Sequence, residues 1–315
     1  MTSTRSWETP PRPFPVAYSP KYRVDYGAHV FPVEKYDRIW QALREDDVLG
    51  PLLEAVEPEP LPLEDLARVH TREYLQKLEE GRLTPYEVAI LEIPYRRDIY
   101  EAFRISCGGT WLAAQWAMRW GLGVHIGGGF HHAFPDHGEG FCMLNDVAVA
   151  IEKGLAEGLF QRALIVDLDV HHGNGNAAIF AGRSDVFTFS IHQENNYPVF
   201  KPPSHLDIGL PDGADDRMYL EALRRGLATI ETRFEPDIVF YIAGADPYEH
   251  DCLGGLGLTI AGFRERDVRV LEWVRRRGAA CVITLGGGYA LRVEDTVAIH
   301  VQTIREALRL WVKGE

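Results

Sequence analysis

The sequence is poor in cysteine and has no long apolar run. Its 315 residues include only four cysteines, and no two of them form a Cys-x-x-Cys pair, which excludes a zinc ribbon and a thioredoxin-type redox pair. No apolar run is long enough for a transmembrane helix. The first residues, MTSTRSWETPPRPFP, lack the apolar core of a secretory signal. These absences predict a soluble protein of a reducing, cytoplasmic compartment.

Positive charge is scarce as well. The chain carries 33 lysine and arginine residues against 46 aspartate and glutamate residues, for a net charge of −13. That balance argues against direct binding to nucleic acid or to an anionic membrane. It is compatible with a cationic substrate, such as a modified lysine or a polyamine, although solubility alone is the simpler explanation.

The hydrophobic pattern predicts a single α/β domain. Residues 1–14 are rich in proline and are expected to form a flexible arm, and residues 15–315 the domain. Predicted strands cover residues 15–18, 123–126, 163–168, 186–191, 237–243 and 279–285, and predicted helices cover residues 33–44, 63–69, 71–81, 99–120, 145–157, 174–181, 215–233, 261–277 and 292–312. Three segments stay open: 48–63 is irregular with room for a short strand, 86–97 is ambiguous, and 205–210 is extended or hairpin-like. Strands that alternate with helices indicate a mostly parallel central sheet with helices on both faces.

The stretch Ala163–Asn176, ALIVDLDVHHGNGN, joins a buried strand to a dense set of polar residues. Side chains alternate along a strand, so Asp167, Asp169 and His171 are predicted to share one face. Two carboxylates and an imidazole at this spacing suit a metal ion, and the alternative is a buried polar pair at a strand end. Ligands of open α/β sheets bind at the carboxyl ends of strands, which favours the metal.

The other predicted strands of the sheet end in similar residues. His131 and His132 follow residues 123–126, His192 follows 186–191, Asp246 follows 237–243 and Tyr289 follows 279–285. Asp169, His171 and Asp246 together offer three ligands and an open position, as in a catalytic zinc site. Oxygen-rich ligation also admits iron(II) or manganese.

The remaining polar residues suit hydrolysis. The pair His131–His132 is suited to acid–base work near neutral pH. Asp167 would orient one of these imidazoles, and Tyr289 would donate a hydrogen bond to a developing oxyanion. A metal, a histidine pair and a tyrosine donor predict a hydrolase that activates water and protonates a leaving amine.

Four motifs carry a family resemblance. GGGFHHAFPDHGEGFCMLNDVAVAI, VDLDVHHGNGN, the GAD of residues 244–246 and LGGGY resemble the zinc-dependent histone deacetylase family, which has the arginase–deacetylase fold. The match runs from about Tyr18 to the end of the chain, and it looks closest to class IV enzymes and bacterial histone-deacetylase-like amidohydrolases.

The resemblance implies an activity and a role for each residue. The activity is removal of an acetyl or longer acyl group from an amine such as acyl-lysine; acetylpolyamine or small-amide hydrolysis, or an inactive acyl-binding module, are the alternatives. The resemblance implies zinc (or Fe²⁺) bound by Asp169, His171 and Asp246, and structural potassium near Asp167, Asp169, His171, Ser190 and Ile191. It implies that His131 and His132 are an acid–base pair, with Asp167 behind His131, and that Tyr289 polarises the carbonyl. The implied substrate tunnel is lined by Gly140, Phe141, Tyr197 and Leu253.

Several positions depart from the family pattern. Asn174 stands where many relatives carry Asp, and an amide cannot stabilise the His132 imidazolium as a carboxylate would, so His132 is hypothesised to act mainly as a neutral base. The pair His250–Asp251 replaces a usual Gly–Asp and is expected to alter the tunnel rim. His137 and His192 are expected to be structural. With Asn at 174 and Tyr at 248, the second metal of an arginase would lack ligands.

Overall fold

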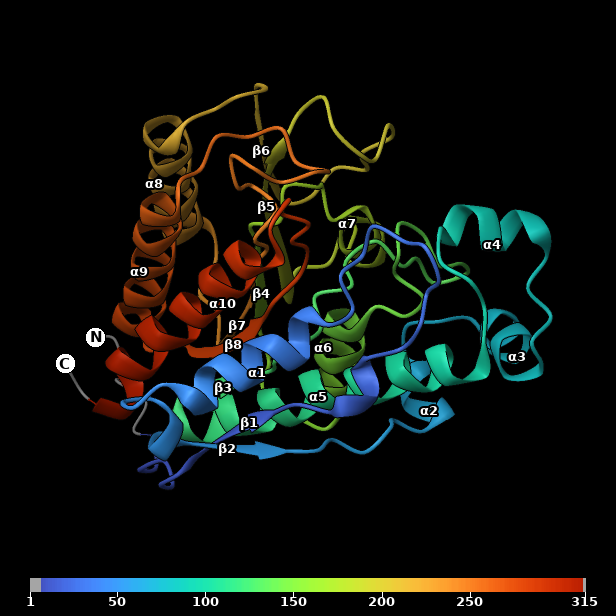
Figure 1. Cartoon of the computed structure of the whole chain (residues 1–315), viewed down its shortest axis with the longest axis horizontal. Helices are drawn as coiled ribbons and strands as arrows, with labels where there is room; N and C mark the ends of the chain where they lie inside the picture. The colour runs from blue at the N-terminus through green and yellow to red at the C-terminus, as the bar shows by residue number, and fades with distance from the viewer. Residues whose placement is uncertain (1–6, 314–315) are drawn as a thin grey trace.

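The central sheet is entirely parallel. The computed structural model describes residues 7–313, and its six central strands lie side by side in the order β3-β8-β7-β4-β5-β6 (Figure 1). Their bounds are Leu122–Val124 (β3), Ala163–Asp167 (β4), Val186–Gln193 (β5), Leu206–Leu210 (β6), Ile238–Ile242 (β7) and Ala280–Thr284 (β8). Every residue of β4, β7 and β8 is buried, as expected for strands covered on both faces.

A second pair of parallel strands continues this sheet. β1 (Phe14–Ala17) pairs with β2 (Leu53–Val56), and Ala17 forms a β-bridge with His125, just after β3. The short strand predicted over residues 15–18 is therefore confirmed, and the segment 48–63 does contain a strand.

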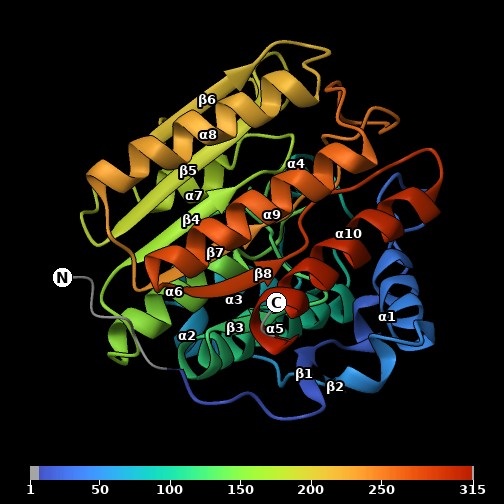
Figure 2. The same cartoon turned by 90° about the vertical axis from the view of Figure 1, so that its left-hand side faces the viewer.

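Helices cover both faces of the sheet. α8 (Asp216–Arg233), α9 (Ile260–Arg277) and α10 (Val293–Leu308) run side by side over one face, with α1 (Lys35–Glu45) next to α10 (Figure 2). The opposite face carries α5 (Arg97–Trp120), which packs on α6 (Asp146–Ala156), and α7 (Asn174–Ile179). The remaining elements are α2 (Leu63–Leu66), α3 (Arg72–Glu80), α4 (Pro85–Leu91), the 3-10 turns Pro20–Tyr22 and Gly50–Leu52, and a π turn over Arg309–Lys313.

Local sequence signals place the helix ends. The side chains of Asn145, Asp215 and Thr259 accept a backbone N–H at the starts of α6, α8 and α9. α9 ends at Gly278, which adopts the left-handed conformation at φ +66°. The three N-caps hold the ends of loops that leave the carboxyl ends of β3, β6 and β7.

The structure shows which elements form in the other two segments that the sequence left open. Residues 86–97 contain most of α4 and the first residue of α5, and residues 205–210 contain the parallel edge strand β6 instead of a hairpin. Of the predicted arm, residues 1–6 lie outside the described residues, while the backbone N–H of Glu8 donates to the carbonyl of Arg119 at 3.0 Å. Within residues 7–313, no helix is both long and apolar enough to cross a bilayer.

Candidate active site

The loops at the carboxyl ends of β3, β4, β7 and β8 bring the predicted site residues together. Asp146, at the start of α6, shapes the first loop: its carboxylate accepts the backbone N–H of Gly129 and that of Phe130, at 3.1 and 2.8 Å. This contact fixes the backbone just before His131. Because neighbouring parallel strands end at one edge of the sheet, residues far apart in sequence meet there.

Asp169, His171 and Asp246 form a buried group whose ligand atoms lie within 4.8 Å of one another. His171 Nδ1 lies 3.0 Å from Asp169 Oδ1 and 3.3 Å from Asp246 Oδ2. Asp246 Oδ1 accepts the backbone N–H of Val170, but Asp246 Oδ2 is buried and has no hydrogen-bond partner among the described residues. An orphaned carboxylate oxygen in a buried site is costly, so this donor set fits a divalent cation.

The charges of this group reflect its burial. Burial opposes a charge on His171, but its contacts with Asp169 and Asp246 outweigh that effect and raise its pKa to about 10. Burial and the charge of Asp169 raise the pKa of Asp246 to about 7. Both shifts show two carboxylates that need a positive charge between them.

The glycine turn at Gly286 and Gly287 packs against the metal-ligand candidates Asp169 and Asp246. The backbone N–H of Gly287 donates to Asp169 Oδ2 at 2.7 Å, and the carbonyl of Gly286 accepts from the buried Lys35 Nζ at 2.8 Å. A Cβ at Gly287 would overlap Asp246 Oδ2 and lie 2.8 Å from Asp169 Oδ2. The close approach of backbone and carboxylates therefore requires glycine at this position.

Gly287→Ala is expected to destabilise the protein by about 1–3 kcal/mol, as overpacking does, and to lower its metal content. Thermal unfolding and elemental analysis measure both effects. Gly257→Ala is the matched control, because a Cβ there meets its nearest atom at an ordinary 3.4 Å. Equal stability and metal content in the two variants would contradict the packing argument.

The histidine pair sits between a carboxylate and an amide. His131 Nδ1 lies 2.8 Å from Asp167 Oδ2, and His132 Nδ1 lies 2.6 Å from Asn174 Oδ1. The two Nε2 atoms face each other at 3.0 Å, so one of them carries a proton and the other accepts it.

The two imidazoles differ in basicity. Burial disfavours the charge on His131, but Asp167 and Asp169 outweigh it and raise its pKa to about 9. Burial and the neighbouring imidazoles of His131 and His171 set the pKa of His132 well below its usual range. The contact with Asn174 acts in the opposite sense, so burial and the neighbouring imidazoles, more than the amide, favour the neutral form.

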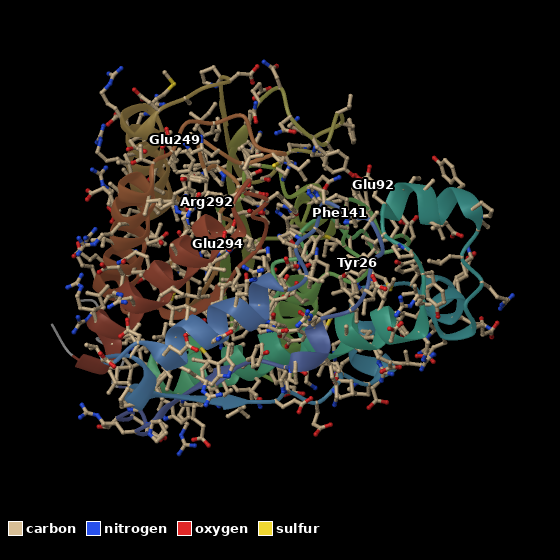
Figure 3. All side chains as sticks on the ribbon, in the orientation of Figure 1. Tyr26, Glu92, Phe141, Glu249, Arg292 and Glu294 are labelled. Atoms are coloured by element: carbon tan, nitrogen blue, oxygen red, sulfur yellow. The ribbon has the colours of Figure 1, made fainter. Side chains whose placement is uncertain are left out.

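A cavity of about 220 Å³ leads to these residues. The four predicted tunnel residues line it, together with His132, His171, Tyr289, Asn196 and Glu92. Figure 3 shows Glu92 and Phe141 close to one another, on loops that leave α4 and β3. Both have positive φ, at 61° and 66°, although neither is glycine, and such strain is typical of functional loops.

A larger cavity of about 670 Å³ lies beside the tunnel, with Asp136, His137 and Glu139 in its wall. His137 Nδ1 lies 2.7 Å from Asp136 Oδ1, and its Nε2 lies 3.4 Å from Glu139 Oε2. None of the metal-ligand candidates and neither member of the histidine pair lines this cavity, so the smaller one is the candidate reaction site.

Tyr289 is held from two sides. Its ring packs edge-on against Phe31 and Phe141, with centroids 5.9 and 6.0 Å apart, and its backbone N–H donates to Asp251 Oδ2 at 2.6 Å. Asp251 Oδ1 accepts the backbone N–H of Leu253 at 2.8 Å, while His250 is exposed. Asp251, which the family pattern shares, thus links the tyrosine loop to the tunnel rim, whereas the departing residue His250 does not line the tunnel.

The residues named for potassium lie on and after two paired strands. Asp167 of β4 pairs in register with Ser190 of β5, Ile191 follows, and Asp169 and His171 lie in the loop after β4. Ser190 Oγ lies 2.9 Å from His192 Nδ1.

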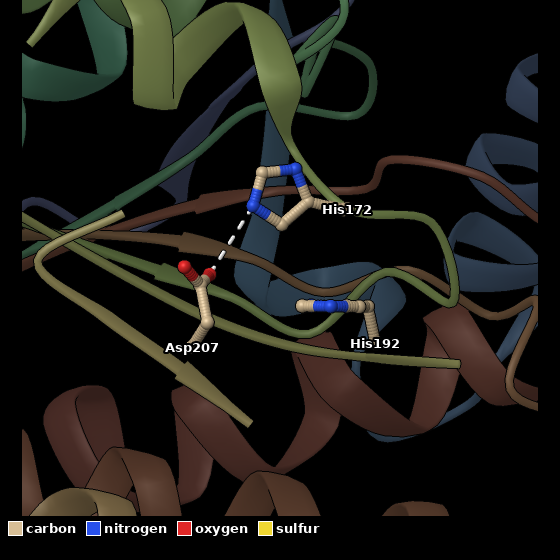
Figure 4. Close-up of side chains that lie close together, drawn as sticks. All are labelled: His172, His192 and Asp207. Atoms are coloured by element: carbon tan, nitrogen blue, oxygen red, sulfur yellow. Dashed lines mark ion pairs between the residues drawn. The ribbon is translucent and has the colours of Figure 1, made fainter. Parts of the chain in front are cut away.

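His192 belongs to another group, with His172 and Asp207 (Figure 4). His172 Nε2 lies 3.2 Å from Asp207 Oδ1, while His172 Nδ1 is buried and has no hydrogen-bond partner in the described chain. A metal on Nε2 would leave a buried, unpaired N–H at Nδ1, whereas an Nε2–H that donates to Asp207 leaves only an unpaired acceptor. We therefore assign this group to packing between the loop after β4 and the strands β5 and β6.

Comparison with known proteins identifies the family. Residues 29–304 match the family model described as Histone deacetylase domain. The chain is 41% identical to an uncharacterized protein of Picosynechococcus sp., over 91% of this chain and 96% of that protein. It is 27% identical to Histone deacetylase 2 of Arabidopsis thaliana, over 96% of this chain and 82% of that protein.

A solved structure agrees with this result. The crystal structure of the HDA15 HD domain superposes with a TM-score of 0.76 at 22% sequence identity, over 95% of this chain and 96% of that chain, which shows a common fold. A parallel sheet flanked by helices, matched to that domain, is the arginase–deacetylase fold. Within that class the chain belongs to the histone deacetylase family, and it is a deacetylase-type hydrolase of a generally zinc-dependent family. The resemblance seen in the sequence is confirmed.

Proposed function

We propose that the protein is a zinc-dependent deacylase that hydrolyses the amide of an acylated amine such as acetyl-lysine or a longer acyl-lysine. The observation that supports this most directly is the buried, orphaned Asp246 Oδ2 beside Asp169 and His171, at the end of a tunnel that also exposes His132 and Tyr289. Zn²⁺ held there by these three residues would polarise the amide carbonyl and make water a better nucleophile. Fe²⁺ suits the same donors.

The chain's own residues handle protons and charge. His132 accepts a proton from the attacking water, and the histidine pair delivers a proton to the departing amine nitrogen as the C–N bond breaks. Asp167 holds His131 in its charged form. Tyr289 donates its O–H to the oxygen that becomes negative in the tetrahedral intermediate. Every role that hydrolysis needs has a residue, which disfavours an inactive binding module.

The proposal includes two further assignments. A structural potassium ion is assigned to the carbonyls and side chains of Asp167, Asp169, His171, Ser190 and Ile191. The four unpaired cysteines suit a reducing, cytoplasmic compartment.

A panel of amides tests the function. The zinc-loaded protein should release amine and carboxylate in equal amounts from acetyl-lysine peptides, long-chain acyl-lysine peptides, acetylated polyamines or small amides. The class with the highest kcat/KM identifies the substrate. Failure to hydrolyse any of them, with one metal ion bound per chain, would reject the proposal.

An acetylated polyamine is the second candidate, and Glu92 is the observation that favours it. Its carboxylate lines the tunnel, where a distal ammonium of the substrate would lie. Glu92 is exposed, but partial desolvation of its carboxylate and the charge of Glu139 raise its pKa, so a cation nearby would relieve an unfavourable charge.

Glu92→Gln is expected to raise KM about 2- to 5-fold for cationic substrates and to leave KM for neutral amides unchanged, since an exposed ion pair contributes below 1 kcal/mol. Steady-state kinetics on matched charged and neutral amides measures this difference. Glu249→Gln is the control, because Glu249 does not line the tunnel and lies far from Glu92 and Phe141 (Figure 3). An equal KM change for both substrates would show that Glu92 does not select for charge.

A further inference from the structure

The amide of Asn174 is part of a longer hydrogen-bonded chain. Its Oδ1 contacts His132 Nδ1 at 2.6 Å, and its Nδ2 donates to Glu139 Oε1 at 2.7 Å. The same Glu139 oxygen accepts the hydroxyl of the tunnel residue Tyr197 at 2.8 Å. The Glu139 carboxylate therefore accepts hydrogen bonds both from Asn174, which contacts His132, and from Tyr197 in the wall of the tunnel.

The hydrogen bonds between these side chains determine which of their atoms carry the protons. A carboxylate only accepts hydrogen bonds, so the NH₂ group of Asn174 must face Glu139, and its carbonyl oxygen then faces His132. His132 must in turn carry a proton on Nδ1 to donate to that oxygen. In the neutral imidazole the lone pair is then on Nε2, the atom that faces His131 and the reaction site.

Glu139 also has the charge and the support that this role requires. Burial works against its ionisation, but hydrogen bonds from His137, Tyr197 and Asn174 outweigh it and lower the pKa of Glu139. Its backbone forms reciprocal hydrogen bonds with Cys142, and its side chain is 17% exposed, toward the larger cavity. A neutral side chain of the same size can occupy this position without overpacking.

We infer that Glu139 is the positioning residue for His132. Its carboxylate acts through the Asn174 amide and replaces the carboxylate that the protein lacks at position 174. The inference rests on the proposed function, because it assigns His132 as the base. A polarised amide between a carboxylate and an imidazole strengthens both hydrogen bonds and favours the Nδ1–H tautomer.

The relation between positions 139 and 174 provides the test. Glu139→Gln should lower kcat about 10-fold with KM within about twofold, a loss typical of a residue that orients a reactive group. Asn174→Asp alone should also lower kcat, because it places a second carboxylate against Glu139. The double variant should recover to within about threefold of the original kcat, since the carboxylate then contacts His132 directly. Losses that multiply in the double variant would overturn the inference.

A matched control separates this role from support of the tunnel wall. Tyr197→Phe removes the other hydrogen bond to the same Glu139 oxygen and should act mainly on KM. A Glu139→Gln variant that behaves in the same way, with kcat unchanged, would show that Glu139 serves only the wall. Thermal unfolding and metal content should stay unchanged in all variants that are compared.

A readout without turnover distinguishes failure of the inference from failure of the proposed function. The ¹⁵N shifts of His132, assigned through a His132→Gln variant, report which ring nitrogen carries the proton. The original chain should show Nδ1–H, and Glu139→Gln should shift the signal toward a mixture of tautomers. An unchanged tautomer would overturn the inference even if no amide is hydrolysed, and absence of turnover alone would reject only the proposed function.

Discussion

Tyr289→Phe is expected to lower kcat roughly 10²- to 10³-fold and to leave KM within about threefold, which is the loss seen when one oxyanion donor is removed. The ring is buried against Phe31 and Phe141, and phenylalanine keeps those contacts. Burial and the charges of Asp246 and Asp169 raise the pKa of the Tyr289 phenol, so it stays protonated and available as a donor. The loss should therefore fall on the transition state and spare substrate binding.

Kinetics with a fluorogenic acyl-lysine amide measures this effect. Tyr248→Phe is a suitable control, because Tyr248 is a buried tyrosine that does not line the tunnel. It should keep kcat within about twofold. A Tyr289→Phe enzyme with undiminished kcat would remove the tyrosine from the mechanism and leave the metal as the sole group that stabilises the oxyanion.

Much of this site could be predicted from the sequence because one rule governs it. Parallel strands end at one edge of the sheet, so the polar residues that follow residues 163–168, 237–243 and 279–285 had to approach one another. The long apolar runs of these strands are clear signals. The fold class followed from the same pattern.

Other functional positions gave no such signal. Glu92 and Glu139 are single acidic residues in loops, and these loops contain Glu92 itself and Phe141 with positive φ, which the local sequence does not predict. Lys35 lies in an amphipathic helix, where a lysine is expected at the surface. Instead it is fully buried over the Phe31 and Tyr289 rings, and burial lowers its pKa to about 8 despite the nearby Asp246 and Asp169.

Short elements were also difficult to predict. β2 has four residues in a segment rich in proline, too few for a period of two to be recognised. It forms only because β1 offers an open edge with which it pairs in parallel. Tertiary contacts, which the local sequence does not show, decide such elements.

Asp246→Asn is expected to weaken metal binding on the order of 10²- to 10⁴-fold, because removing one partner of a buried charged pair costs about 3–5 kcal/mol. The zinc content after dialysis, measured by elemental analysis, should fall from about one ion per chain toward zero, and the rate of hydrolysis should fall with it. Treating the original protein with a chelator should reproduce the loss, and zinc should reverse it. Asp207→Asn serves as the control, since that carboxylate contacts His172 outside the site.

Asp246→Asn should, in contrast, stabilise the metal-free protein. Without a cation, Asp246 Oδ2 is a buried oxygen that accepts no hydrogen bond and lies next to a second carboxylate, Asp169, with His171 Nδ1 3.3 Å away. An amide removes the like charge, and its oxygen can still accept the backbone N–H of Val170. Relief of about 1 kcal/mol corresponds to a rise of roughly 2–4 °C in Tm for the chelated protein. Adding zinc should therefore raise the Tm of the original chain but not that of Asp246→Asn. A variant that loses stability both with and without zinc would show that Asp246 is a structural residue and not a ligand.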